Sequence, residues 1–277
     1  MTAGWVAGTV RAGAMARRVL GADAARQLAA APSLAGAQRL VEATAFRAAA
    51  DPGLSLAAAQ HAIAATILWD LRVLAGWLPR DGVSMLRLLA GWFEIANVDE
   101  LLHALAGRPS GAEFQLGALA TAWPRLCEAG SPAELRHVLA ASAWGDPGGD
   151  TSRDIRAGLR ARWAARLIGA GDPVSAWASA AAAVASLTVP GRARQGRPSR
   201  PRSAIAAVPA AEPWQAEADW WRRIEYEGRV LLRSSATDGL PVLGAVVVMT
   251  ADARRVRAAL ASAARGGRTL GAYDALV

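Results

Sequence analysis

The stretch Glu94-Ile-Ala-Asn97-Val-Asp99-Glu-Leu-Leu102 returns in altered form as Asp252-Ala-Arg-Arg255-Val-Arg257-Ala-Ala-Leu260. Each copy has an acid, a polar residue three positions later, then an aliphatic residue, then a charge, and a leucine at its end. Positions three, four and eight residues apart lie near one face of an α-helix. The pattern predicts two amphipathic helices, each with a carboxylate at the edge of its apolar stripe. Chance likeness in a chain rich in alanine and leucine would also explain it.

The spacing also predicts a partner for each acid. Side chains three residues apart on a helix can bond to each other, so we expect Glu94 to bond Asn97 and Asp252 to bond Arg255. An exposed pair of this kind contributes about 0.2–0.5 kcal/mol. If the acids are instead buried and pair across helices, removing one partner should cost about 3–5 kcal/mol. Neither copy contains a nucleophile with a base, so the repeat indicates a scaffold rather than an enzyme.

The composition predicts an all-α protein. The 277 residues can bury a large core, as one or two domains. Hydrophobic residues make up 53% of the chain, and alanine, the best helix former, dominates them. A β-branched run occurs at Val246–Val248 and few others exist. We therefore expect helical bundles and no sheet.

The chain is strongly basic, with a formal charge of +8 and no lysine among its 31 basic residues. Residues 192–202 hold five arginines and no acid. This basic segment fits a solvated linker, and it could also contact anionic lipid headgroups or nucleic acid.

The sequence gives no sign of a catalytic, cofactor-binding or metal-binding residue. A single cysteine, Cys127, excludes an internal disulfide, and its apolar surroundings predict a buried thiol. The three histidines are far apart in the sequence. No apolar run approaches the roughly 20 residues that a spanning helix needs, and the N-terminus lacks the pattern of a signal peptide.

Turn sequences and capping residues predict where the helices begin. The expected first residues or caps are Asp23, Ser33, Ser55, Ser84 and Ser131. Pro79–Gly82 is expected to end a long helix that starts at Ser55. Trp77 and Trp92, at matching places on either side of this turn, are expected in the core of an antiparallel pair.

Four segments organise the chain in this interpretation. They are an N-terminal helical module (1–108), a degenerate middle helical module (109–187), a basic flexible linker (188–213) and a C-terminal helical module (214–277). One copy of the repeated pattern lies in the first module and the other in the last, and no clear third copy occurs between 150 and 190.

Three collinear segments resemble one family. They are Trp5–Leu20, which includes Arg11; Trp92–Leu102; and Pro241–Met249 followed by Asp252, Arg255 and Arg257. Together they resemble the C/d family of central-stalk couplers in A-type and V-type rotary ATPases. The candidate motif and interface residues are Arg11, Glu94, Asn97, Asp99, Asp252, Arg255 and Arg257.

The resemblance implies a funnel built from three pseudo-equivalent helical bundles. The mouth of the funnel would receive the foot of the rotor shaft, and the opposite face would lie on the membrane proteolipid ring. The chain would then be a non-catalytic peripheral component at the cytoplasmic face of the membrane. It would need no cofactor and no nucleic acid, and it would couple ATP turnover to proton or sodium transport.

Two other classes of function remain open. A basic helical module could bind nucleic acid through the arginines of 192–202, with affinity that falls steeply with salt. A helical enzyme could use a dispersed carboxylate site. The acids available for such a site are Asp150, Asp154, Glu225 and Glu227, which fit better as helix-start and surface charges.

Overall fold

A computed structural model describes residues 3–169, 213–234 and 238–276 of the chain, and their regular secondary structure is entirely helical. The prediction of an all-α protein is therefore confirmed. The expected alanine-rich helix up to residue 187 and the basic segment 192–202 lie outside the described residues, and so does nearly all of the predicted linker 188–213.

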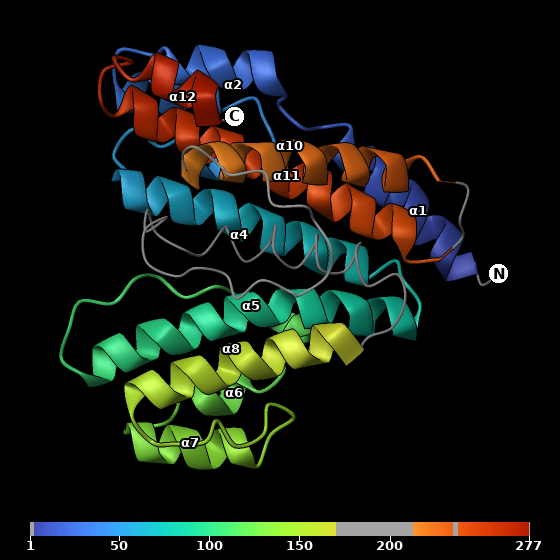
Figure 1. Cartoon of the computed structure of the whole chain (residues 1–277), viewed down its shortest axis with the longest axis vertical. Coiled ribbons are helices and arrows are strands. Elements are labelled where there is room, and N and C mark those ends of the chain that lie inside the picture. Colours follow the sequence, from blue (N-terminus) through green and yellow to red (C-terminus); the bar gives the residue numbers. More distant parts are fainter. Residues whose placement is uncertain (1–2, 170–212, 235–237, 277) are drawn as a thin grey trace.

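The helices are shown in Figure 1. Their bounds are α1 (Ala3–Ala16), α2 (Ala22–Ala29), α3 (Leu34–Leu40), α4 (Leu56–Ala75), α5 (Arg80–Leu105), α6 (Trp123–Leu126), α7 (Pro132–Ala140), α8 (Ser152–Gly169), α10 (Pro213–Leu232), α11 (Leu240–Ala263) and α12 (Leu270–Leu276). Two short 3-10 turns, η1 (Arg47–Ala49) and η2 (Gly117–Leu119), complete the described elements.

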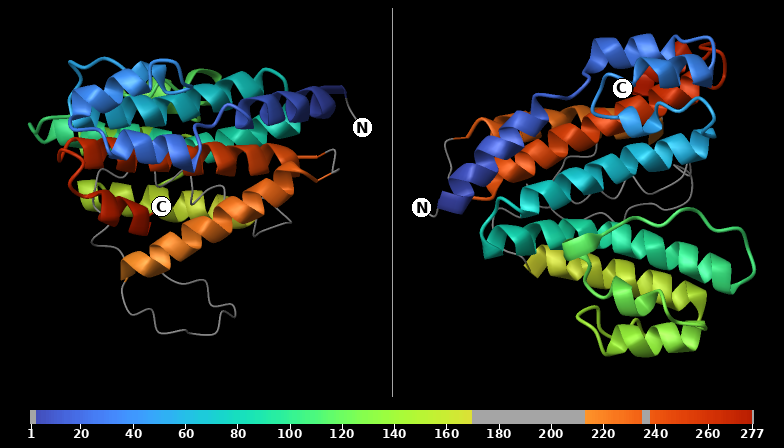
Figure 2. Two further views of the ribbon diagram at one scale, coloured as in Figure 1. Left: turned by 90° about the horizontal axis from the view of Figure 1, so that it is seen from above. Right: turned by 180° about the vertical axis from the view of Figure 1, so that it is seen from behind.

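The long helices α11, α4, α5 and α8 run roughly across the long axis of the molecule, and they follow one another along it in that order (Figure 1). The short helices α2, α3 and α12 gather near one end, and α6 and α7 lie at the other (Figure 2). The first group packs on α11, which carries one copy of the repeated pattern, and α7 of the second group packs on α8, the neighbour of the helix α5 that carries the other copy.

Helix α11 is the centre of the larger half. Its residues Pro241–Ala253 are all buried, because α1, α2, α4 and α10 pack around it. A helix that is apolar all round is expected in a protein core. Helix α10 crosses it closely at Gly228 and Gly244, where a Cβ on Gly244 would lie 2.5 Å from the Leu232 backbone nitrogen. These glycines are what allows the close contact.

Serine caps were predicted well and the other helix starts were not. Ser33, Ser55 and Ser131 each accept a hydrogen bond from a backbone N–H three residues later. Asp23 is not a cap, because α2 already begins at Ala22, after Gly21 in the left-handed region (φ 84°).

The predicted start of α5 at Ser84 was also wrong, since the helix begins at Arg80 directly after Pro79. Packing explains the earlier start. Gly82 lies under Leu78 and Trp5, where an added Cβ would come within 2.8 Å of the Leu78 Cβ. The sequence Pro79–Gly82, which was expected to stop a helix, thus opens the next one.

Two side chains expected in the core are exposed. Cys127, at the C-terminal cap of α6, is exposed because that helix has only four residues and covers little surface. Trp77 is 50% exposed, whereas Trp92 is partly buried with its ring centroid 4.8 Å from that of Trp163. The turn between α4 and α5 therefore does not place both indoles in one layer.

The C-terminal segment packs on the N-terminal one. Helix α11 contacts α1, α2 and α4, and α12 contacts α2. The two copies of the repeated pattern belong to different helices of one packed body. The division into four segments remains a prediction.

Candidate functional site

The first acid of the repeated pattern binds backbone amides of a distant loop. Glu94, on α5, is fully buried. Its two oxygens accept hydrogen bonds from the N–H of Thr121 at 2.6 Å and the N–H of Ala122 at 2.7 Å. The indole N–H of Trp144 donates a third bond of 2.8 Å. Charge-assisted bonds of this kind are among the stronger ones in proteins.

The second acid does the same on the other side of the molecule. Asp252, on α11, is 1% exposed. Its oxygens accept from the N–H of Leu20 at 2.7 Å and the N–H of Gly21 at 2.9 Å. Asp252 and these donors are more than 230 residues apart in the sequence. The acid on α11 thus joins the C-terminal part of the chain to its N-terminal part.

The two sets of donors occupy equivalent places. Thr121 and Ala122 directly precede α6, and Leu20 and Gly21 directly precede α2. The N–H groups at a helix start have no partner within the helix, and the start of a helix favours negative charge. Each acid therefore fixes the beginning of a short helix to the side of a long one.

The likeness continues downstream of the bound loop. Both short helices are followed by a serine that caps a second short helix: Ser33 caps α3 and Ser131 caps α7. Eleven residues after each of these serines stands a hydroxyl, from Thr44 in one segment and from Ser142 in the other. The spacing between cap and hydroxyl is thus identical in the two segments.

The two hydroxyls make the same pair of bonds. Thr44 Oγ1 donates to the carbonyl of Val41 at 2.7 Å, and Ser142 Oγ donates to the carbonyl of Leu139 at 2.8 Å. Each also accepts from the N–H two residues later, which belongs to Phe46 or to Trp144.

The equivalent segments are thus 20–46 and 121–144, and we call them the two acid-bound segments. Sequence reasoning found the acids and the serine caps but missed the equivalence. The spacing of serine, hydroxyl and aromatic residue was the signal for it.

The predicted partners of the acids were wrong. Asn97 does not bond Glu94; its amide exchanges two bonds with the backbone of Phe114, at 2.7 and 2.9 Å. Arg255 pairs with Glu225 on α10. Both acids lie on buried helix faces, where backbone N–H groups from another segment need an acceptor. That need outweighs a pairing within the helix.

The residue five positions after the acid differs between the copies. Asp99 accepts from Arg156 at 3.0 Å and from Arg160 at 2.7 Å, and so ties α5 to α8. Arg257 has the opposite charge, and burial lowers its pKa to about 10. The remaining candidate, Arg11, lies on α1 with its guanidinium 6.0 Å from the ring centroid of Trp77. These three residues thus lie on three different helices, α5, α11 and α1.

Two of the carboxylates considered for an enzyme are held by side chains of their own chain. Glu225 is nearly buried between Arg229, 2.7 Å away, and Arg255, so it is not the surface charge that was expected. Asp154 accepts from the Thr151 hydroxyl at the start of α8. In the described ranges no three His, Cys, Asp or Glu side chains are grouped so that they could hold a metal ion.

The geometry gives Glu94 and Asp252 a structural role. Burial raises the pKa of Asp252, and the hydrogen bonds from Gly21 and Leu20 oppose this shift. Each oxygen of both carboxylates accepts at least one hydrogen bond from the chain itself. The chemistry available is the locking of short helices onto long ones.

The chain was compared with protein-family models and with curated proteins, and neither comparison found a match. Across the described residues, the helices are all too short or too polar to span a membrane.

Proposed function

We propose that this chain is a non-catalytic central-stalk component of a V/A-type ATPase, which couples the rotating shaft to the membrane proteolipid ring for proton or sodium transport. The observation that carries the proposal is the pair of acid-bound segments. A repeated unit in which an acid on a long helix holds a short helix pair fits the pseudo-equivalent bundles of the family that the sequence resembles.

The acid-bound segments suit the transmission of torque. A coupler must not store rotation in soft joints, and a buried hydrogen bond to a charged group contributes about 1.5–3 kcal/mol. Glu94 joins α5 to the start of α6, and Asp252 joins α11 to the start of α2. Asp99 adds a bridge from α5 to α8. These ties would let the long helices turn as one body.

The finer features belong to the same proposal. The helical bundles would form a funnel whose mouth receives the foot of the shaft and whose other face lies on the ring. The chain would be peripheral, at the cytoplasmic face of the membrane. Residues 192–202 would be near enough to the membrane to contact anionic lipid.

Co-purification from the source organism tests the proposal. The chain would carry an affinity tag, and membranes would be solubilised in a mild detergent. Mass spectrometry of the eluate should find the shaft proteins and the ring proteolipid in fixed proportion to the tagged chain. The matched control is an unrelated tagged helical protein of similar charge. An intact rotary ATPase purified without this chain would refute the proposal.

A second arm of the experiment addresses the open alternative. Binding of the purified chain to duplex DNA and to single-stranded RNA would be measured at low salt and again at moderate salt. The rotor proposal expects no specific binding. Tight binding that falls by several decades with salt, together with the absence of the other ATPase proteins from the eluate, would favour a nucleic-acid-binding protein.

A further inference from the structure

A third buried carboxylate differs from the two acids described above. Asp70, on α4, is 5% exposed. Its ion-pair partner is Arg18, whose Nη2 lies 3.9 Å from the Asp70 Oδ1, which is too long for a hydrogen bond. The Arg18 side chain is itself 54% exposed. In the part of the chain that the structure describes, no backbone N–H bonds Asp70 as backbone N–H groups bond Glu94 and Asp252.

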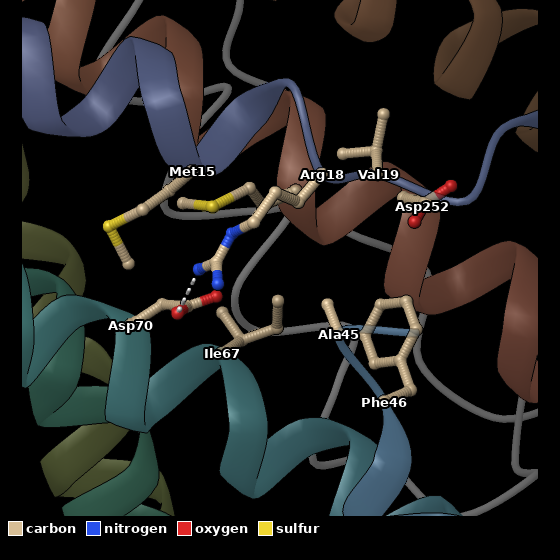
Figure 3. A pocket seen from close by; sticks show the side chains of 9 residues that line it. Met15, Arg18, Val19, Ala45, Phe46, Ile67, Asp70 and Asp252 are labelled. Atoms are coloured by element: carbon tan, nitrogen blue, oxygen red, sulfur yellow. Dashed lines mark ion pairs between the residues drawn. The ribbon is translucent and has the colours of Figure 1, made fainter. Parts of the chain in front are cut away.

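Asp70 lines a small cavity between four parts of the chain (Figure 3). The cavity has a volume of about 10 Å³, close to the least that one water molecule needs. Its lining comes from the end of α1, the turn before η1, and helices α4 and α11: Met15, Arg18, Val19, Ala45, Phe46, Ile67, Asp70, Met249 and Asp252. A proton or a single water could thus reach a carboxylate that is otherwise packed among apolar groups.

The charged groups around Asp70 come from two neighbouring elements. Arg18 and Arg11 belong to α1 and the turn that follows it, and both favour the ionised acid. Asp252 belongs to α11 and lies across the cavity, with its oxygens on the backbone of residues 20 and 21 (Figure 3). Desolvation outweighs the two arginines, so the pKa of Asp70 is raised to about 6.

We propose that Asp70 is a proton-binding site that controls how firmly α1 is docked on α4. Met15 of α1 and Arg18 and Val19 of the turn after it line the cavity at Asp70, so the carboxylate regains bulk water when this cover lifts. Protonated Asp70 favours the closed state, in which α1 is packed on α4. Ionised Asp70 favours an open state, in which α1 has lifted and the carboxylate is hydrated. The site is a property of the fold and does not depend on the proposed rotor function.

The direction of the pH effect follows from linkage. The acid binds its proton more tightly in the closed state than in the open or unfolded one, so α1 is held most firmly at low pH. Its attachment weakens as the pH rises from about 4 to the folded-state pKa of about 6, and stays weak above it. The opening constant of α1 should rise on the order of 20-fold between pH 4.5 and 7.5.

Hydrogen exchange of the full chain tests this proposal. Exchange of the α1 amides, corrected for the intrinsic effect of pH, would be followed by mass spectrometry between pH 4.5 and 7.5. The wild type should show the rise in opening, and Asp70→Asn should show protection that is nearly independent of pH. Asp81→Asn, at an exposed acid on the neighbouring helix, is the matched control and should behave as the wild type.

A second measurement keeps the proposal testable if Asp70→Asn does not fold. Carbon-13 NMR of the side-chain carboxyls would give the pKa of Asp70 directly, and Arg18→Gln should raise it because a favourable cation is lost. A carboxyl that titrates near 4, or α1 protection with the same pH profile in the wild type and in Asp70→Asn, would overturn the proposal.

Discussion

The two acid-bound segments share their frame and differ at one aromatic residue. Trp144 and Phe46 stand at equivalent places, thirteen residues after the serine cap of each segment. The indole of Trp144 gives Glu94 a third donor. Phe46 has no such group, and it lies with Asp252 along the lining of the small cavity. The Glu94 segment is therefore complete in its hydrogen bonding, whereas the Asp252 segment leaves room beside the acid.

The two copies therefore share the hydrogen bonds from one carboxylate to a loop, whereas most of their other residues differ. Both acids satisfy two consecutive N–H groups ahead of a short helix. The positions after each acid have taken different partners, from the Phe114 backbone for Asn97 to Glu225 for Arg255.

The largest effect is expected for Glu94→Ala. It leaves three donors without an acceptor, two of them buried, and removing one partner of a buried charged interaction costs about 3–5 kcal/mol, so we expect a loss of that size. Urea unfolding of the variant and of the exposed control Glu128→Ala measures it. If the rotor proposal holds, stability should fall before shaft binding does; normal stability with abolished binding would make Glu94 a contact residue instead.

Asp252→Ala should have a smaller effect of the same kind. Two donors rather than three lose their acceptor, and both are only partly buried, so each should cost about 1–2 kcal/mol and the pair about 2–4 kcal/mol. Because the acid holds the two residues directly before α2, hydrogen exchange should rise first in α2. Asp150→Ala, at an exposed acid, is the control. A larger loss for Asp252→Ala than for Glu94→Ala would contradict our ranking of the two segments.

Trp144→Phe gives segment 121–144 the aromatic residue that segment 20–46 has at the equivalent position. It removes one charge-assisted bond to Glu94, for which we expect a loss of about 1.5–3 kcal/mol, and it also removes part of a buried ring, whose cost is the same with or without Glu94. In the Glu94→Ala background the same substitution should reduce the free energy of unfolding by much less, because the carboxylate that accepts from the indole is already absent. Equal losses in both backgrounds would show that the indole acts through packing alone.

The smallest effects are expected for the serine caps. Ser33→Ala and Ser131→Ala each remove one bond to a helix N–H, at a cost of about 1 kcal/mol. If the two segments are equivalent, thermal unfolding should show similar losses for both. Ser55→Ala, at the cap of α4 outside either segment, is the reference. A difference of more than about 1 kcal/mol between Ser33→Ala and Ser131→Ala would argue against equivalence.

The sequence by itself determined the helical class, three serine caps and the choice of Glu94 and Asp252 as related acids. Those features are local, because helix propensity, capping and spacing on one face act over a few residues. What the acids bind was decided by the tertiary structure. Their donors lie 27 to 232 residues away along the chain, so only packing brings them into reach. The same holds for Asp70, because the sequence of α4 alone does not predict that α1 buries this side chain. That burial is what raises the pKa of Asp70.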